Sequence, residues 1–536
     1  MKILFIKPRL SSNTLGGMDY SICEPLEFET LAAGLPDHDI RILDLRFDPD
    51  LKGEIERFKP DIAGTTSMSV NVYAARDILR KVKSYDPAIT TIVGGYHATV
   101  APEDFAEPYI DAIVIGQGVD TLRDAVRALE AGRGLESVPG LAIPAGPGVV
   151  KRTAKRGKVF DLDLQPIPVR TFNPHHRKYY FCEYWQPCAI MRASIGCHAR
   201  CSFCALWDLT DGKYLTHTVN RVVDEIQSIP EKYVFFNDDN FMPKGHEKRV
   251  IEIRNEILRR GIDKEYYFST RTDMVLARPD IIEKWVDAGL RRVFFGLEAN
   301  DNDRLKSLNK GLSEDINLKA IKICHANGIA ITGCFIVDPS FTRGDFLRLT
   351  EYAARINLNI VAFLVLTPHP GTILHAVRRH EIIHPNYELW DHMHSVFRTN
   401  LPEKEFYREY AKLWMRSYTP MTWDGAKRAG RMLRLSSAVQ KLHLMRTVVS
   451  IFPKIALGAA GHGANAAANW MNWALGRKIE RVVRGRSHPL LPSLRPEALA
   501  LLTEENMNTE YFDDEKKRLI SNARETDKNI KPAPVF

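Results

Sequence analysis

Short apolar runs alternate with amphipathic stretches along roughly the first 125 residues of the chain. Uninterrupted apolar runs are typical of parallel strands, because helices cover both faces of such a sheet. Residues 72–87 place small and aliphatic side chains on one helical face and end at Pro87, which predicts a crossover helix. The pattern predicts a doubly wound α/β domain, in which ligands bind at the carboxyl ends of the strands. The predicted strands are Lys2–Pro8, Asp39–Arg46, Asp61–Ser67, Thr90–His97 and Asp111–Gly118.

The same alternation returns between Ile190 and about Asn400, with amphipathic segments such as 278–289 and 318–328 between the apolar runs. It predicts a partial (β/α)6 barrel of the TIM type, whose chemistry belongs at the C-terminal ends of its strands. The predicted strands are Cys188–Ser194, Tyr233–Asp238, Tyr266–Asp273, Arg291–Ala299, Ile329–Val337 and Asn359–Pro368.

The remaining segments have a different composition. Residues 141–187 are rich in proline and glycine, which favours a linker or a β-ribbon. Residues 401–536 contain stretches of basic and apolar residues at helical spacing, and they are predicted to be helical. The predicted organisation is therefore an α/β domain at 1–140, a linker at 141–187, a barrel at 188–400 and a helical C-terminal region at 401–536.

Composition adds few constraints to this picture. The 536 residues carry a net charge of +8, which suits anionic partners without identifying one. No N-terminal signal and no apolar run of transmembrane length is evident, so the chain is expected to be cytoplasmic. The basic amphipathic C-terminal region suits contact with the inner face of a membrane, or simple packing on a core with its basic face in solvent. No nucleic-acid recognition motif is found, and no nucleic-acid partner is expected.

The stretch SIGCHARCSFC carries the strongest chemical signal in the sequence. Cys197, Cys201 and Cys204 follow a C-x3-C-x2-C spacing. Three thiolates are one fewer than a closed structural zinc site needs, whereas a [4Fe–4S] cluster on three cysteines keeps one iron open for another ligand. A zinc site completed by His198 is the alternative. The eight cysteines of the chain do not suggest a disulfide framework.

With Phe203 before its last cysteine, this motif resembles the signature of the radical S-adenosylmethionine (SAM) enzymes. The resemblance implies that the open iron binds the amino and carboxylate groups of SAM, and that residues at the ends of the barrel strands hold the rest of the molecule. Asp238 as a helix cap and Arg271 in a surface ion pair remain the alternatives. The implied contacts are Asn237, Asp238 and Asp239 for the amino group, Ser269 and Arg271 for the carboxylate, and Glu298 for the ribose.

Three further stretches, GTTSMS (64–69), VGGYHATVAPEDF (93–105) and IGQGVDT (115–121), resemble the cobalamin-binding domain that is fused to many radical SAM enzymes. The D-x-H-x-x-G motif is missing, so a bound cobalamin would lack the histidine ligand to cobalt. A flavodoxin-like domain that binds no cofactor, with a capping role for His97, is the alternative. The residues implied to contact cobalamin are Thr65, Thr66, Ser67, Ser69, Gly94, Gly95 and His97.

Taken together, these resemblances identify a cobalamin-binding radical SAM enzyme of the class B methylase type. Phrases such as FFNDDN and YELWDHMHS are similar to those of the hopanoid C-3 methylases and the bacteriochlorophyll side-chain methylases. The resemblance implies methylation of an unactivated carbon of an apolar small molecule, with a flavodoxin or ferredoxin as electron donor. A tetrapyrrole ring cyclase and a non-catalytic metal- or cluster-binding scaffold are the alternatives. Candidate substrate contacts are Trp207, Tyr214 and Trp390.

Overall fold

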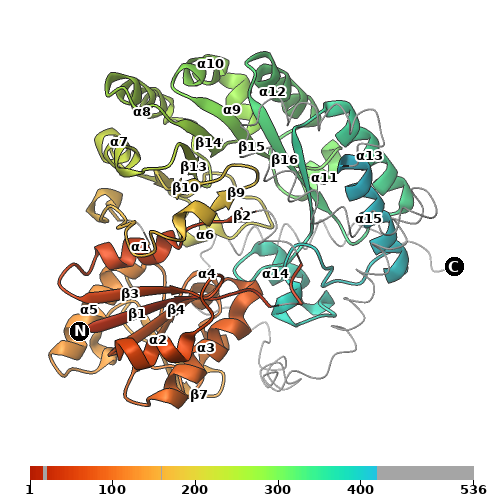
Figure 1. Ribbon diagram of the computed structural model, residues 1–536. Coiled ribbons are helices and arrows are strands. Elements are labelled where there is room, and N and C mark those ends of the chain that lie inside the picture. The colour runs from red at the N-terminus through yellow and green to blue at the C-terminus, as the bar shows by residue number, and fades with distance from the viewer. Residues whose placement is uncertain (12, 16–20, 159, 419–536) are drawn as a thin grey trace, which may run out of the picture.

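The computed structural model describes residues 1–11, 13–15, 21–158 and 160–418. Figure 1 shows two α/β units, with the N-terminal third of the chain forming one and the residues up to 418 forming the other. The fold class predicted from the sequence is confirmed. Among the described residues, no helix combines the length and apolar character that a membrane-spanning segment needs. The predicted basic helices beyond residue 418 lie outside the described residues.

The first unit is built on a seven-stranded sheet with five parallel strands. Alternate residues of each strand point to opposite faces: Leu4 and Ile6 pack beneath α2 and α3, and Ile3 and Phe5 beneath α1 and α5. In sheet order the strands are β3 (Asp39–Asp44), β1 (Lys2–Lys7), β4 (Ile62–Thr66), β5 (Thr90–Gly94), β6 (Ala112–Val114), β7 (Leu141–Gly146) and β8 (Val149–Arg152). The helices are α1 (Leu26–Ala33), α2 (Leu51–Phe58), α3 (Val72–Tyr85), α4 (Tyr96–Val100) and α5 (Gly118–Glu130).

Two predicted strands of this sheet are shorter than expected, and glycines are the reason. Gly95 has φ +98° and Gly116 has φ +75°, conformations that end an extended strand and that glycine adopts at little cost. The chain therefore turns into α4 directly after β5, and into α5 soon after β6. The predicted boundary at residue 140 falls immediately before β7 and β8, which continue the first sheet as an antiparallel edge.

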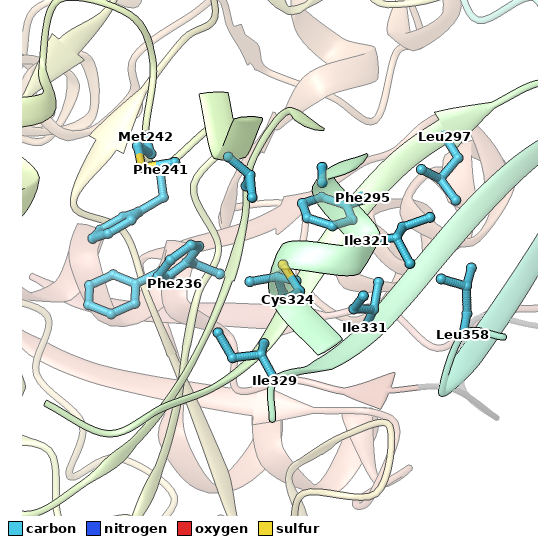
Figure 2. Close-up of a cluster of buried hydrophobic side chains, with 14 of the residues drawn as sticks. Phe236, Phe241, Met242, Phe295, Leu297, Ile321, Cys324, Ile329, Ile331 and Leu358 are labelled. Carbon is cyan, nitrogen blue, oxygen red and sulfur yellow. The ribbon is translucent and has the colours of Figure 1, made fainter. Parts of the chain in front are cut away.

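The second unit is an open barrel of six parallel strands. Its strands are β10 (Cys188–Met191), β13 (Tyr233–Phe236), β14 (Glu265–Ser269), β15 (Leu290–Glu298), β16 (Ala330–Val337) and β17 (Ile360–Val365). The outer helices are α7 (Val219–Ser228), α8 (Glu247–Arg259), α9 (Thr272–Ala277), α10 (Pro279–Asp287), α12 (Glu314–Ala326), α13 (Arg343–Ile356) and α15 (Glu403–Tyr418). Figure 2 shows part of the apolar layer between strands and helices, including Phe236, Phe295 and Cys324.

Small elements complete both units and mostly lie near the strand ends. The pair β2–β9 joins the start of the chain to the segment that precedes the barrel, and β11–β12 frames the cysteine loop. These elements are β2 (Ser21–Ile22), β9 (Phe181–Cys182), β11 (Ser194–Ile195), β12 (Leu215–Thr216), α6 (Leu206–Leu209), α11 (Asn302–Ser307) and α14 (Ile373–Arg378).

The segment 181–187 fills the amino end of the barrel. Glu183 forms an ion pair with Arg292 of β15 and accepts a hydrogen bond from Thr332 Oγ1 at 3.0 Å. The Arg292 guanidinium lies 4.1 Å from the ring centre of Tyr184 and 4.6 Å from that of Tyr267. Burial lowers the pKa of Arg292 to about 9. This segment thus occupies the amino end of the barrel, opposite the carboxyl ends of the strands.

A buried network of charges, called the ionic clamp below, connects the two units. Its members are Glu24, Glu29, Arg170, Arg177, Glu225 and Glu231. Arg170 pairs with Glu24 beside α1 and, at 2.7 Å, with Glu225 of α7, while Arg177 bridges Glu24 and Glu231. The Glu24 side chain is fully buried, and it also accepts the backbone N–H of Ile190 at 2.9 Å. The clamp therefore fixes the connecting segment and the first barrel strand against the first unit.

Candidate active site

A cavity of about 1800 Å³ lies where the carboxyl ends of the two sheets meet. The first unit lines it with the ends of β4, β5 and β6, and the barrel lines it with the cysteine loop and the residues after β10 and β13. A third wall comes from residues 369–392, which follow the last barrel strand. Both sheets thus place their ligand-binding edges on one shared space, as expected for parallel α/β folds.

The three cysteines of the motif lie on the loop between β11 and α6. Cys201 is buried, Cys197 and Cys204 are half-buried, and all three thiols are free. Cys204 lines the cavity. Burial raises the pKa of Cys204 to about 12 and also raises that of Cys201, so binding to a metal must displace their protons. Free thiols on a short loop at the barrel mouth suit an iron–sulfur cluster, because each cysteine then binds a different iron.

His198, the fourth ligand in the zinc alternative, lies beside the rings of Tyr214 and His246. Its ring centre is 5.8 Å from that of Tyr214 and 6.2 Å from that of His246. In the part of the chain that the structure describes, no three Cys, His, Asp or Glu side chains converge as the ligands of a single metal ion would.

Hydrogen bonds from several barrel elements fix the cysteine loop. Gly196 donates its N–H to Asp239 Oδ2 at 3.1 Å, and its φ of +104° leaves no room for a side chain, since a Cβ would lie 2.2 Å from the Lys213 carbonyl oxygen. Ser202 N–H donates to the Leu308 carbonyl at 3.0 Å. The loop is therefore held in place independently of any bound metal.

The predicted contacts after β13 separate into two roles. Asn237 lines the cavity, as does Asp239. Asp238 is buried and accepts hydrogen bonds from Ala193 N–H at 3.0 Å and from the Ser194 hydroxyl, and burial raises its pKa to about 6. Its carboxylate does not line the cavity, and it holds the strand leading into the cysteine loop.

Arg271 and Glu298 lie close enough to Cys201 to affect its pKa, and neither they nor Ser269 line the cavity. The Arg271 guanidinium donates to Asp273 and, at 3.1 Å, to the Lys310 carbonyl. Glu298 is buried with φ +62° at an irregular position of β15, and its carboxylate accepts from Lys310 Nζ at 2.8 Å. Burial has the largest single effect on the pKa of Lys310 and lowers it, but Glu298 and Cys201 together raise this pKa above its ordinary value. Lys310 was not predicted, because it lies on a loop outside any motif.

In the first unit, the hydroxyl residues after β4 serve mainly to shape the backbone. Thr65 Oγ1 donates to the Ile6 carbonyl at 2.8 Å, and Ser67 N–H donates to the Gly94 carbonyl at 2.8 Å. Thr65, Thr66 and Ser69 line the cavity. Ser67 is fully buried, and its hydroxyl is bound within its own turn.

His97 is fully buried, and its ring does not line the cavity. Its Nδ1 lies 3.0 Å from Ser69 Oγ and its Nε2 lies 2.8 Å from Asp104 Oδ2, while the Tyr387 hydroxyl donates to the same Asp104 oxygen at 2.8 Å. The structure thus places His97 of α4 in a network that joins this helix to Tyr387 of the third wall. Gly94 and Gly95, in contrast, lie on the cavity surface.

Replacing Gly95 by alanine is expected to destabilise the first unit by about 3 kcal/mol, because strain at positive φ adds to a steric clash. A Cβ there would lie 2.6 Å from Thr66 Oγ1 and 2.8 Å from the Ser67 carbonyl oxygen. Urea unfolding and cobalamin titration would measure the loss. Gly132→Ala is the matched control: its φ is +65°, but no atom lies within 4 Å of a new Cβ, so about 1 kcal/mol is expected. Equal losses in both variants would contradict the steric argument.

The third wall is rich in imidazole and aromatic rings, and only Trp390 of this wall was predicted. His369 Nε2 lies 3.1 Å from His392 Nε2, and the Trp390 ring centre is 6.1 Å from that of His369. The Tyr96 hydroxyl of α4 donates to the Pro370 carbonyl at 2.5 Å, which joins this wall to the first unit. Of the other predicted substrate contacts, Trp207 packs on Ile373, and the Tyr214 hydroxyl donates to Ser194 at 2.7 Å; neither lines the cavity.

His375 gives the third wall a defined response to acid. Burial lowers its pKa from 6.5 to about 4. As the pH falls, His375 therefore takes up a proton in the unfolded chain before it does so in the folded one. Its contribution to the free energy of unfolding is complete above pH 6.5 and is lost as the pH falls towards 4. We expect His375→Gln to reduce the loss of unfolding free energy between about pH 7 and about pH 4.5 by up to about 3 kcal/mol. Urea titrations at both pH values would show this; the exposed His380→Gln should leave the pH dependence unchanged.

Comparison with known families agrees with both units. Residues 14–126 match the B12 binding domain family, and residues 191–353 match the Radical SAM superfamily. These matches cover β3 to β6 of the first sheet and β13 to β16 of the barrel, together with the cysteine loop.

Curated relatives and solved structures share both units. The chain is 30% identical over 414 residues to the hopanoid C-3 methylase of Methylococcus capsulatus, covering 75% of this chain and 78% of the relative. It is 30% identical over 387 residues to the anaerobic magnesium-protoporphyrin IX monomethyl ester cyclase of Rubrivivax gelatinosus, covering 69% and 68%.

Two solved structures have the same fold. The cobalamin-dependent SAM radical enzyme OxsB, with aqua-cobalamin and SAM bound, aligns with a TM-score of 0.65 at 17% identity, over 99% of this chain and 84% of that one. The methyltransferase TsrM from Kitasatospora setae, with cobalamin and a [4Fe–4S] cluster bound, aligns with a TM-score of 0.60 at 16% identity, over 77% and 90%. With its two family matches and its 30% identity to a relative of similar extent, the chain belongs to the cobalamin-binding radical SAM enzymes of the class B methylase type.

Proposed function

We propose that this enzyme transfers a methyl group to an unactivated carbon of an apolar small molecule, and that a hopanoid, methylated at C-3, is the first candidate substrate. The observation that carries the proposal is the shared cavity of about 1800 Å³, which is bounded by the cysteine loop on one side and by the edge of the first sheet on the other. A polycyclic substrate can occupy this space and meet both regions. The similarity to the hopanoid C-3 methylase supports the choice of substrate.

The residues at the barrel mouth fit the cofactors of the family. Cys197, Cys201 and Cys204 would hold the [4Fe–4S] cluster, Asn237 the amino group of SAM, Ser269 and Arg271 its carboxylate, and Glu298 its ribose. Lys310 would orient Glu298 through their 2.8 Å ion pair. When bound, the cofactors of the family supply the radical that activates a C–H bond and the methyl group that replaces the hydrogen.

In the first unit, the backbone of Gly94 and Gly95 and the hydroxyls of Thr66 and Ser69 would face the corrin ring. Because Gly94 and Gly95 have no side chains, a flat macrocycle can approach the sheet edge closely. His97 would act indirectly, because its hydrogen bonds to Ser69 and Asp104 fix the turn that carries these residues. The chain thus positions its ligands and excludes water from the space between them.

A tetrapyrrole is the second candidate substrate, and the similarity to the magnesium-protoporphyrin cyclase favours it. We further propose a flavodoxin or ferredoxin as electron donor, and a cytoplasmic protein whose C-terminal region contacts the inner face of the membrane. A membrane contact would bring an apolar substrate to the enzyme, as expected for a basic amphipathic segment.

The test is anaerobic loading of the full chain with iron, sulfide and cobalamin, followed by incubation with SAM, a reductant and candidate substrates. About four iron and one cobalt per chain, formation of 5′-deoxyadenosine and a methyl gain on a hopanoid are the expected results. A methyl gain on a tetrapyrrole alone would change the substrate, and ring closure without a methyl gain would favour a cyclase. Zinc in place of iron without 5′-deoxyadenosine would favour the non-catalytic scaffold.

A further inference from the structure

Arg192 follows directly after β10 and faces the cavity between the two units. The alternation of the strand explains its direction: Ala189 and Met191 pack into the core beneath the helices, whereas Cys188 and Ile190 point to the inside of the barrel and its mouth. Within the described residues, the guanidinium of Arg192 has no hydrogen bond and no ion pair, and its Nε is buried without a partner.

The polar groups around Arg192 are already bound to others. Asp238 is bound to Ala193 and Ser194, and Asp239 is bound to Gly196. Burial raises the pKa of both carboxyl groups, and the positive charge of Arg192 lowers it by a smaller amount. Arg192 therefore acts on both carboxyl groups through its charge, without a direct contact. Asn237 also lines the cavity beside these residues.

Other arginines of this region show the contrast. The Arg249 guanidinium donates to the carbonyls of His217 at 2.9 Å and Ala193 at 2.7 Å, and that of Arg271 donates to Asp273 and to the Lys310 carbonyl. Each of these guanidinium groups thus makes hydrogen bonds within the protein, although Arg249 Nη1 is buried without a partner. Arg192 differs in that none of its donors has a partner among the described residues, while its side chain lines the cavity, where a ligand can reach it.

We propose that Arg192 binds an oxyanion, a carboxylate or a phosphate, of the ligands that meet in this cavity. The planar guanidinium presents paired N–H donors that match the two oxygens of such a group, and it stays charged at any physiological pH. The proposal rests on the proposed use of the cavity as the reaction chamber. The oxyanion comes either from an acidic substrate or from the methionine end of SAM, whose carboxylate Arg192 would then share with Ser269 and Arg271. Binding experiments separate these two sources.

The first experiment measures SAM binding to the anaerobically loaded protein by equilibrium dialysis, without a reductant. If Arg192 binds the SAM carboxylate, Arg192→Gln should raise the Kd for SAM at least tenfold, which is the range for losing a charge-assisted hydrogen bond. Arg192→Lys keeps the charge but not the paired N–H donors. Its Kd for SAM should lie between those of the unmodified protein and of Arg192→Gln.

The second experiment measures binding of protoporphyrin IX, which carries two carboxylates, and of its dimethyl ester, which carries none. If Arg192 binds an acidic substrate, the unmodified protein should bind the free acid at least tenfold more tightly than the ester, as expected for a charge-assisted contact. In Arg192→Gln this preference should disappear while the affinity for the ester is kept. A SAM affinity that stays unchanged would then assign the oxyanion to the substrate.

Arg291→Gln is the control, because it removes the same charge from an exposed position of β15. If Arg192→Gln, like the control, changes neither the Kd for SAM nor the preference for the free acid, the proposal is wrong. Both experiments measure binding without turnover. A failure to methylate any substrate would therefore contradict the proposed function, but the binding data would still test the role of Arg192.

Discussion

Replacing Cys204 by alanine is expected to abolish the formation of 5′-deoxyadenosine, a loss of at least several orders of magnitude. The physical reason is that two remaining thiolates cannot hold a cluster that needs three, and no other described Cys, His, Asp or Glu side chains converge nearby as a replacement set. Cys204 also lines the cavity, so the change falls at the reaction space itself. Iron content and 5′-deoxyadenosine would be measured in the same anaerobically loaded sample.

The matched control for this variant is Cys324→Ala. Cys324 is fully buried in the apolar layer between strands and helices, where its replacement removes one small side chain from the core (Figure 2). It should cost about 1 kcal/mol of stability and leave the iron content unchanged. Should Cys204→Ala retain a full complement of iron and cleave SAM at the normal rate, the cluster assignment would have to be abandoned.

Removing the central charge of the ionic clamp is expected to be the largest single loss of stability. In Glu24→Gln, Arg170 and Arg177 lose the nearer of the two buried carboxylates that they share, while Glu29 stays 3.7 and 3.9 Å away. Breaking a buried ion pair by neutralising one partner costs about 3 to 5 kcal/mol. We therefore expect the first urea unfolding transition to shift markedly, together with a loss of protection from proteolysis in the segment that carries both arginines.

A surface ion pair serves as the control for the clamp. Asp280 and Arg278 form two hydrogen bonds, at 2.8 and 2.9 Å, but both side chains are more than a third exposed. Asp280→Asn should cost less than about 1 kcal/mol, because water already screens the pair. If Glu24→Gln cost no more than this, the clamp would not be holding the units together.

The sequence predicted the architecture well because each of its signals is local. Apolar runs identify strands, and three cysteines within eight positions identify the metal loop without knowledge of the fold. The placement of Asn237 and Gly95 at strand ends follows from the same pattern. Errors at strand ends, as at Gly95, arise where one backbone angle rather than hydrophobicity ends the element.

What the sequence did not predict depends on contacts between distant segments. Lys310 meets Glu298 only because β15 and the loop after α11 come together, and Glu24 and Arg170 are 146 residues apart. The direction of Arg192 required knowing where β10 begins and which face the helices cover. Likewise, Asp238 and His97 were assigned to ligands on type and position, yet their hydrogen bonds hold neighbouring turns.

The third wall of the cavity is synthesised long after the first unit that it contacts. The Asn13 amide donates to Glu388 at 2.8 Å across 375 residues of sequence, and Tyr387 binds Asp104 in the same region. The first unit therefore leaves the ribosome long before the residues that cover its ligand-binding edge have been synthesised. During that interval this edge of the sheet lacks the third wall that covers it in the finished protein.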